Sequence, residues 1–138
     1  MENIKRRDIR ESAFIISFEM LFRDDSIDEL FESAAEIEDI VLNKDVRKTV
    51  DGIVAHSSEI DAEISSLSNK RSISRIPRIN LAILRLAIYE ALYDDKVPVN
   101  VAISEAVKLA EKYALEPDVS FINGVLGAFA RKRAAQDE

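Results

Sequence analysis

Positively charged side chains concentrate at the amino end of the chain, where Lys5, Arg6, Arg7 and Arg10 lie close together. Guanidinium and ammonium groups bind phosphate, so the chemistry of this cluster is anion binding. A helix is expected to begin here, and the positive end of its dipole disfavours each cation by about 0.3–1 kcal/mol. Arg6 and Arg10 share one helix face and repel each other, so both are expected to be exposed. Two interpretations stay open: a phosphate-binding end, or a solvated charged helix end.

A second group lies near the start of the last expected helix, at Phe121, Asn123 and Gly124. An aromatic ring and an amide at this position can stack on a nucleic-acid base and hydrogen-bond to it. Glycine inside a helix costs about 0.8–1 kcal/mol relative to alanine, and asparagine is also a poor helix former. For Gly124 the favoured explanation is close packing against another helix. For Phe121 and Asn123 the residues alone leave a binding role and a structural role open.

Groups suited to catalysis or metal binding are scarce. Three glycines cannot form a dinucleotide- or phosphate-binding loop, and the absence of cysteine removes thiolate ligands and nucleophiles. The sequence has one histidine, His56, without a matching ligand set, so a surface or helix-end position is favoured. The carboxylate pairs Asp24–Asp25 and Asp94–Asp95 fall in expected loops, where turn and cap roles are favoured over acid–base catalysis. We therefore expect a protein that is not an enzyme and has no cofactor or metal site.

Charge is unevenly distributed along the chain. The net charge of −7 favours a basic partner and by itself argues against nucleic-acid binding. However, residues 24–45 are strongly acidic while the amino end is basic, so the net charge does not describe the charge at the amino end. The hydrophobic content of 47% suits a core without disulfides, and no segment has the pattern of a signal peptide or a membrane span. The expected location is the cytoplasm.

Helical periods dominate, so helices are expected to position these groups. Ile9, Ala13 and Ile16 begin an apolar stripe in the first helix, and residues 26–29 have the pattern of a capping box. A helical period then runs from Asp45 to Leu67, with a break expected near His56. Residues 77–92 are apolar nearly all round and predict a buried central helix, and Pro98 and Pro117 open two further helices. We expect an all-α bundle of about seven helices in two sub-bundles. It forms one domain, 1–138, with halves at about 1–70 and 77–133 joined by the connector 68–76.

Several blocks of sequence closely resemble the signature of the NusB family, in order and at family spacing. The opening, residues 6–13, is similar to the family pattern RRxARExA. The later blocks are Ala82-Ile-Leu-Arg-Leu-Ala-Ile-Tyr-Glu90, Val97-Pro98, Val101-Ala-Ile103, Glu105-Ala-Val107, Leu109-Ala110 and Phe121-Ile-Asn-Gly-Val-Leu126. The resemblance covers nearly the whole chain and is weakest between residues 24 and 70.

This resemblance implies a transcription antitermination factor of all-α fold. The family binds the boxA element of ribosomal RNA leader transcripts jointly with the ribosomal protein NusE, and helps RNA polymerase pass terminators. The implied partners are single-stranded boxA-like RNA, NusE, and the elongation complex of RNA polymerase with other Nus factors. No membrane is implied, and monomer and homodimer both stay open.

The resemblance also implies which residues meet the RNA. The basic residues Lys5, Arg6, Arg7 and Arg10 would contact phosphates, while Phe18, Ser120, Phe121 and Asn123 would lie along the RNA path. Three positions depart from the family pattern. Ser104 stands where asparagine is usual, and Glu111 and Ser120 stand where lysine is common, so two positive charges near the implied path are absent.

Two other functions remain as alternatives. One is a helical protein-interaction module without RNA binding, which the basic helix start disfavours. The other is an RNA-binding domain related to that of ribosomal RNA methyltransferases. The chain has no glycine-rich methyl-donor motif, so a factor that acts by itself is favoured.

Overall fold

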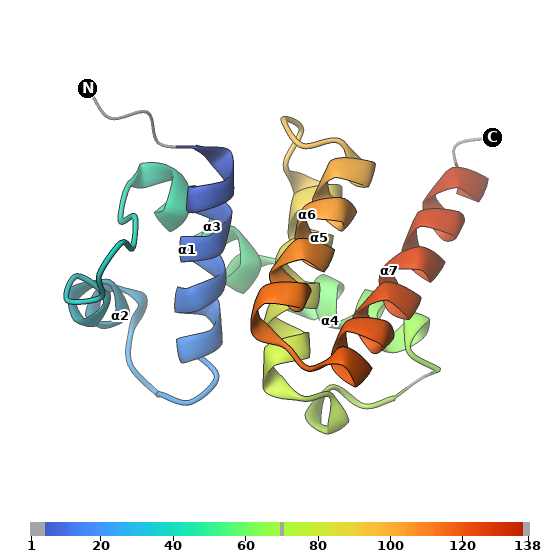
Figure 1. Cartoon of the computed structure of the whole chain (residues 1–138), viewed down its shortest axis with the longest axis horizontal. Helices are drawn as coiled ribbons and strands as arrows, with labels where there is room; N and C mark the ends of the chain where they lie inside the picture. Colours follow the sequence, from blue (N-terminus) through green and yellow to red (C-terminus); the bar gives the residue numbers. More distant parts are fainter. Residues whose placement is uncertain (1–4, 70, 137–138) are drawn as a thin grey trace. The chain divides into compact units, whose positions relative to one another are not determined.

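The computed structural model describes residues 5–69 and 71–136. Within these residues the chain forms seven α-helices and one short 3-10 turn, with no β-strand (Figure 1). This confirms the all-α prediction of about seven helices. None of these helices is long and apolar enough to cross a membrane. The elements are α1 (Arg6–Glu19), α2 (Ile27–Ala34), α3 (Lys44–Ala55), α4 (Ser57–Leu67), η1 (Ile73–Arg75), α5 (Arg78–Tyr93), α6 (Val99–Tyr113) and α7 (Glu116–Gln136).

Contacts between the helices divide the chain into two units, Met1–Ala55 with α1–α3 and His56–Glu138 with α4–α7. The helix break predicted near His56 is confirmed, because α3 ends at Ala55 and α4 begins at Ser57. The division between units differs from the predicted connector at 68–76. The reason is that α4 packs against α5 and α7 and so belongs with the carboxyl-terminal helices. That residues 1–138 act as a single domain stays a prediction.

In the amino-terminal unit, α1 packs against α3 and α2. The predicted apolar stripe of α1 is buried, with Ala13 and Ile16 almost inaccessible to solvent. Val46 and Val50 of α3 are equally buried. Full burial of an aliphatic side chain of this size contributes about 1.5–3 kcal/mol. This apolar face therefore fixes α1, and with it the basic residues at its start.

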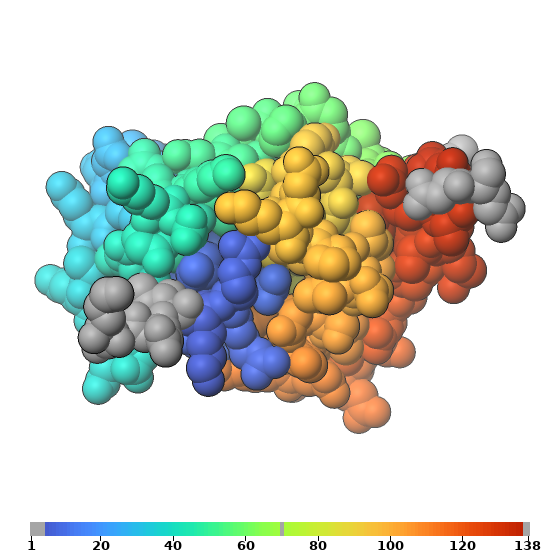
Figure 2. All heavy atoms as spheres, turned by 90° about the horizontal axis from the view of Figure 1, so that it is seen from above, coloured from blue at the N-terminus to red at the C-terminus, as the bar shows by residue number. Residues whose placement is uncertain are grey.

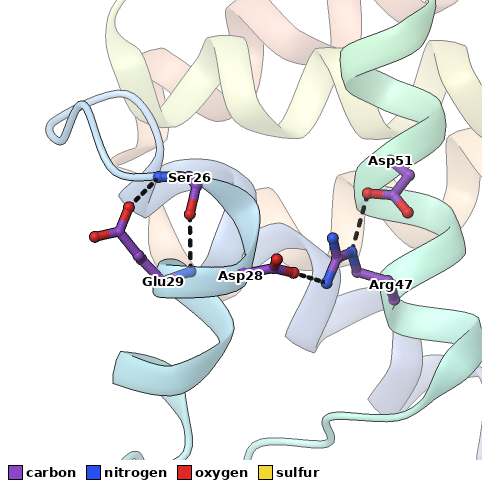
Figure 3. A network of polar contacts seen from close by, with 5 residues as sticks. All are labelled: Ser26, Asp28, Glu29, Arg47 and Asp51. Atoms are coloured by element: carbon purple, nitrogen blue, oxygen red, sulfur yellow. Dashed lines mark hydrogen bonds and ion pairs between the residues drawn. The ribbon is translucent and has the colours of Figure 1, made fainter.

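The capping box predicted at the start of α2 is confirmed (Figure 3). The Glu29 N–H donates to Ser26 Oγ at 3.2 Å, and the Ser26 N–H donates to the Glu29 carboxylate at 3.0 Å. The backbone hydrogen bond from Ser26 lowers the pKa of Glu29. Arg47 of α3 donates to Asp28 at 2.7 Å and to Asp51 at 3.1 Å, which links α2 to α3.

In the carboxyl-terminal unit, α5 packs against α4, α6 and α7. Ten of its residues are buried, and Leu84 and Ile88 have no exposed surface, which confirms the buried helix predicted at 77–92. Helices α6 and α7 also pack against each other and lie side by side in Figure 2. Pro98 precedes α6 and Pro117 lies in the first turn of α7, as predicted.

Candidate nucleic-acid interface

The first turn of α1 presents three basic side chains to solvent. Lys5 occupies the N-cap position with extended backbone and makes no side-chain capping hydrogen bond. Lys5, Arg6 and Arg7 are exposed, and Asp8 is the one acidic residue of this turn. Since a helix start already carries partial positive charge, these cations and the backbone N–H groups together form a surface that attracts anions.

Arg10 differs from its neighbours in the cluster. Its side chain is only 5% exposed, so the prediction that Arg6 and Arg10 are both exposed is wrong for Arg10. The helical period explains the difference, because Arg10 is followed by buried residues three, four and seven positions later, at Ala13, Phe14 and Ser17. Arg10 therefore lies over the buried side of α1, and Arg6 lies one turn earlier on the exposed end.

Phe18 lies in the last turn of α1 and is half-buried. Its ring stacks on Phe14 with centroids 6.1 Å apart, and meets the exposed ring of Phe22 edge-on at 5.0 Å. Arg7 and Phe18 are about three turns apart on one face of the helix. One face of α1 thus carries a cation near its start and an aromatic ring near its end.

The start of α7 places three predicted residues together. Ser120 and Asn123 are exposed, and Phe121 between them is half-buried. Gly124 follows on the exposed side, and a Cβ built there meets no atom within 4 Å. The prediction that Gly124 permits close helix packing is therefore wrong. The first turn of α7 is also joined to α5, because Asn80 Nδ2 donates to Asp118 Oδ1 at 3.1 Å.

Arg71 is a residue that the sequence analysis missed. It follows α4, and its guanidinium carbon lies over the Phe121 ring, 4.9 Å from the ring centroid. Arg71, Arg75 and Arg78 are all exposed. A signal was present in the sequence, because no acidic residue occurs between Glu63 and Glu90 in this acidic chain. The sequence of this segment predicts only a connector, because the contact with Phe121 depends on tertiary structure.

The basic start of α1 and Phe18 belong to the amino-terminal unit, whereas Ser120, Phe121, Asn123 and Arg71 belong to the carboxyl-terminal unit. Within the carboxyl-terminal unit the structure brings Arg71 onto Phe121, whereas in the amino-terminal unit the basic residues and Phe18 lie at opposite ends of α1. Whether all of them contact one ligand stays a prediction.

The histidine and carboxylates that were weighed for catalysis make contacts with neighbouring residues. His56 precedes α4, as predicted for a helix-end histidine, and stacks on Tyr93 with ring centroids 3.8 Å apart. Asp25 pairs with Arg23, and Asp94 accepts a hydrogen bond from the Lys96 N–H at 3.0 Å. In the described part of the chain no group of three or more histidine, cysteine or carboxylate side chains is arranged to hold a metal ion.

The fold and these surfaces define a small all-α protein whose chemistry-bearing groups are exposed cations and aromatic rings. The sequence model of the NusB family matches residues 7–131, and the chain belongs to this family. The resemblance seen in the sequence is thereby confirmed.

Relatives and a solved structure agree with this assignment. The chain is 36% identical over 135 residues to the transcription antitermination protein NusB of Pseudothermotoga lettingae, covering 97% of this chain and 96% of that protein. It is 46% identical to the protein of the same name from a Thermoanaerobacter species over 92 residues, which span 67% of this chain and 65% of that protein. A solved structure of antitermination factors NusB and NusE in complex with double-stranded RNA contains a chain that matches with a TM-score of 0.80. The match has 29% identity and covers 92% of this chain and 96% of that chain.

Proposed function

We propose that this chain is a non-enzymatic transcription antitermination factor. It binds boxA-type RNA of ribosomal RNA leader transcripts together with NusE, and so helps RNA polymerase read through terminators. In this proposal residues 1–138 act as one RNA-binding domain within the elongation complex. Family membership and the names of the relatives support the general role.

The observation that carries the proposal is the exposed basic first turn of α1. Lys5, Arg6 and Arg7 face solvent at a helix end where cations are destabilising, in a chain whose net charge is −7. RNA phosphates bring the negative charge that a helix start favours, and exposed cations there attract them. The solved complex of a similar chain with NusE and double-stranded RNA supports NusE and RNA as the classes of partner.

We assign phosphate contacts to Lys5, Arg6 and Arg7. The RNA path further includes Phe18 on α1, and Ser120, Phe121 and Asn123 at the start of α7. Arg10 is assigned to hold α1 in place and not to contact RNA, because its side chain is buried. Aromatic rings and amides suit unpaired bases, so single-stranded RNA is the preferred ligand.

The acidic excess makes RNA binding depend on a partner. Residues 24–43 contain eight acidic and no basic side chains, and this field repels phosphates at long range. A basic ribosomal protein such as NusE neutralises part of this field and adds its own positive surface. We therefore expect weak RNA binding by the chain alone and much tighter binding by the pair.

A gel-shift titration tests the proposal. The chain, NusE and the mixture are each titrated against a short single-stranded boxA-like RNA, with a scrambled RNA and the matching duplex as controls. We expect the pair to prefer the boxA-like strand and to bind it more tightly than either protein alone. Equal affinity with and without NusE would contradict the proposal. Binding to NusE without any RNA binding would favour the protein-interaction module.

A further inference from the structure

The contact between Arg71 and Phe121 joins two separate parts of the carboxyl-terminal unit. The Arg71 guanidinium carbon lies 4.9 Å from the centroid of the Phe121 ring. Arg71 lies between α4 and η1, and Phe121 lies in the second turn of α7. An arginine over an aromatic face is held by cation–π attraction, worth about twofold to fivefold in an equilibrium at exposed sites.

Both partners are attached to fixed backbone. The Arg71 N–H donates to the Ser68 carbonyl at 3.1 Å, and the Arg71 carbonyl accepts a hydrogen bond from Ser65 Oγ at 3.1 Å. Phe121 is fixed through α7, whose first turn is tied to α5 by the hydrogen bond between Asn80 and Asp118. The guanidinium and the ring are therefore positioned before any ligand arrives, which lowers the entropy cost of binding.

The surroundings suit an unpaired nucleotide. Arg71 itself is exposed, as are Ser120 and Asn123 beside the ring. A guanidinium is planar, so one face can rest on the ring while the other receives a base, and its N–H edges remain able to donate. Arg75 and Arg78 add exposed positive charge in the same segment. Bases in a duplex have their faces covered by neighbouring pairs and cannot stack in this way.

We infer that Arg71 is a base-binding residue: an unpaired RNA base stacks on the guanidinium of Arg71, which Phe121 supports from the other side. This rests on the proposed RNA-binding function and adds to it a stacking site outside the predicted residues. The site recognises the flat face of a base, and it contributes affinity for single strands and not for duplexes.

Arg71→Lys tests the inference, with Arg75→Lys as the matched control. Both changes keep the charge, so the salt dependence of binding should not change, but lysine has no planar face. With NusE present and a single-stranded boxA-like RNA as probe, we expect Arg71→Lys to weaken binding about tenfold, as loss of one stacked base does. Arg75→Lys should bind as the wild type does. Equal affinities for both variants would overturn the inference.

Abasic RNAs locate the base and separate stacking from other roles. Each nucleotide of the probe is replaced in turn by an abasic one, and the replacement that removes the stacked base should weaken the wild type and not Arg71→Lys. Phe121→Leu should weaken binding similarly, and its effect should not add to that of Arg71→Lys. A constant effect of Arg71→Lys at every abasic position would overturn the inference.

The outcomes also separate this inference from the proposed function. A wild-type protein that binds the probe, together with an Arg71→Lys variant of equal affinity, removes the stacking site and keeps the function. A wild type that binds no RNA with NusE overturns both. The melting temperature of Arg71→Lys should match the wild type, because Arg71 is exposed and lysine keeps the positive charge beside the ring.

Discussion

The first turns of α1 and α2 belong to the same unit and follow opposite electrostatic rules. The start of α2 has a capping box, with Asp28 and Glu29 in its first turn, which complements the positive helix end. The start of α1 has no side-chain cap and carries exposed Arg6 and Arg7. The helix dipole favours the charges at the start of α2 and disfavours those at the start of α1. The comparison teaches that α1 places exposed cations where a helix start already attracts anions.

Reversing the charges at α1 is the strongest way to break the comparison. We expect Arg6→Glu with Arg7→Glu to lower RNA affinity at least about a hundredfold, because two phosphate contacts become repulsive. The salt slope of single-strand binding should fall by about 0.7 per lost contact. Stability should change far less than affinity, because acidic residues at a helix start contribute only about 0.3–1 kcal/mol each.

Lys44→Glu with Lys48→Glu serves as the control for this double variant. Both lysines are exposed cations in the first half of α3 in the same unit, so the two double variants change the net charge equally. The RNA affinity of the control should change far less. If both variants lose affinity equally, the effect comes from net charge and the start of α1 is not a contact site.

Arg10→Glu sharpens the comparison within α1. Because Arg10 is buried, the reversed charge is placed where solvent cannot stabilise it, and we expect a loss of at least about 2 kcal/mol of unfolding free energy. Arg6→Glu should lower the unfolding free energy far less, because Arg6 is exposed at the positive end of the helix. Urea unfolding of both single variants distinguishes them. Equal unfolding free energies of the two variants would show that burial at position 10 does not make the charge reversal more destabilising.

Local rules predicted much of the fold. Spacing identified the capping box at residues 26–29, and continuous apolar composition identified the buried helix α5. The predicted exposure of Arg10 was wrong because it followed from the charge of the side chain and not from its position in the helical period. Ala13 and Phe14, three and four residues later, mark the buried side of α1. The helical period places Arg10 on the buried side, and its charged side chain is buried there despite its charge.

The rest depended on tertiary contacts that spacing does not encode. Gly124 looked like a packing glycine, yet no helix lies against it. The division between units fell after Ala55, because α4 packs on α5 and α7 and no local signal specifies that choice. Arg71 meets Phe121 only through the packing of α4 and α7, and a sequence pattern within either segment cannot reveal the pair.

Gly124→Ala extends the comparison to a position inside a third helix, α7. A Cβ at this exposed position meets no atom within 4 Å, so alanine should stabilise α7 by about 0.8–1 kcal/mol through helix propensity alone. Thermal unfolding should show the gain, and RNA affinity should stay as in the wild type. A gain in stability accompanied by a loss of affinity would mean that RNA approaches the backbone of α7 at Gly124.

The smallest expected effect is the pH dependence of the α2 cap. The pKa of Glu29 is lowered from its ordinary value of 4.5, first by the hydrogen bond from the Ser26 backbone and then by the Ser26 side chain. A carboxyl group whose pKa is lower in the folded state contributes stability above pH 4.5, and this contribution is lost as the pH falls through the folded-state pKa. Glu29→Gln keeps a side-chain oxygen to accept from the Ser26 N–H but removes the charge. In urea unfolding, the wild type should therefore be slightly more stable than this variant at pH 7, and the difference should vanish in acid.

Glu32→Gln removes a charge outside the capping box and is the matched control. A difference that stays constant from pH 7 to pH 3 would mean that the cap stabilises α2 through hydrogen bonding alone. RNA affinity should not change in either variant, because the proposed phosphate contacts lie at the start of α1 and not at the start of α2.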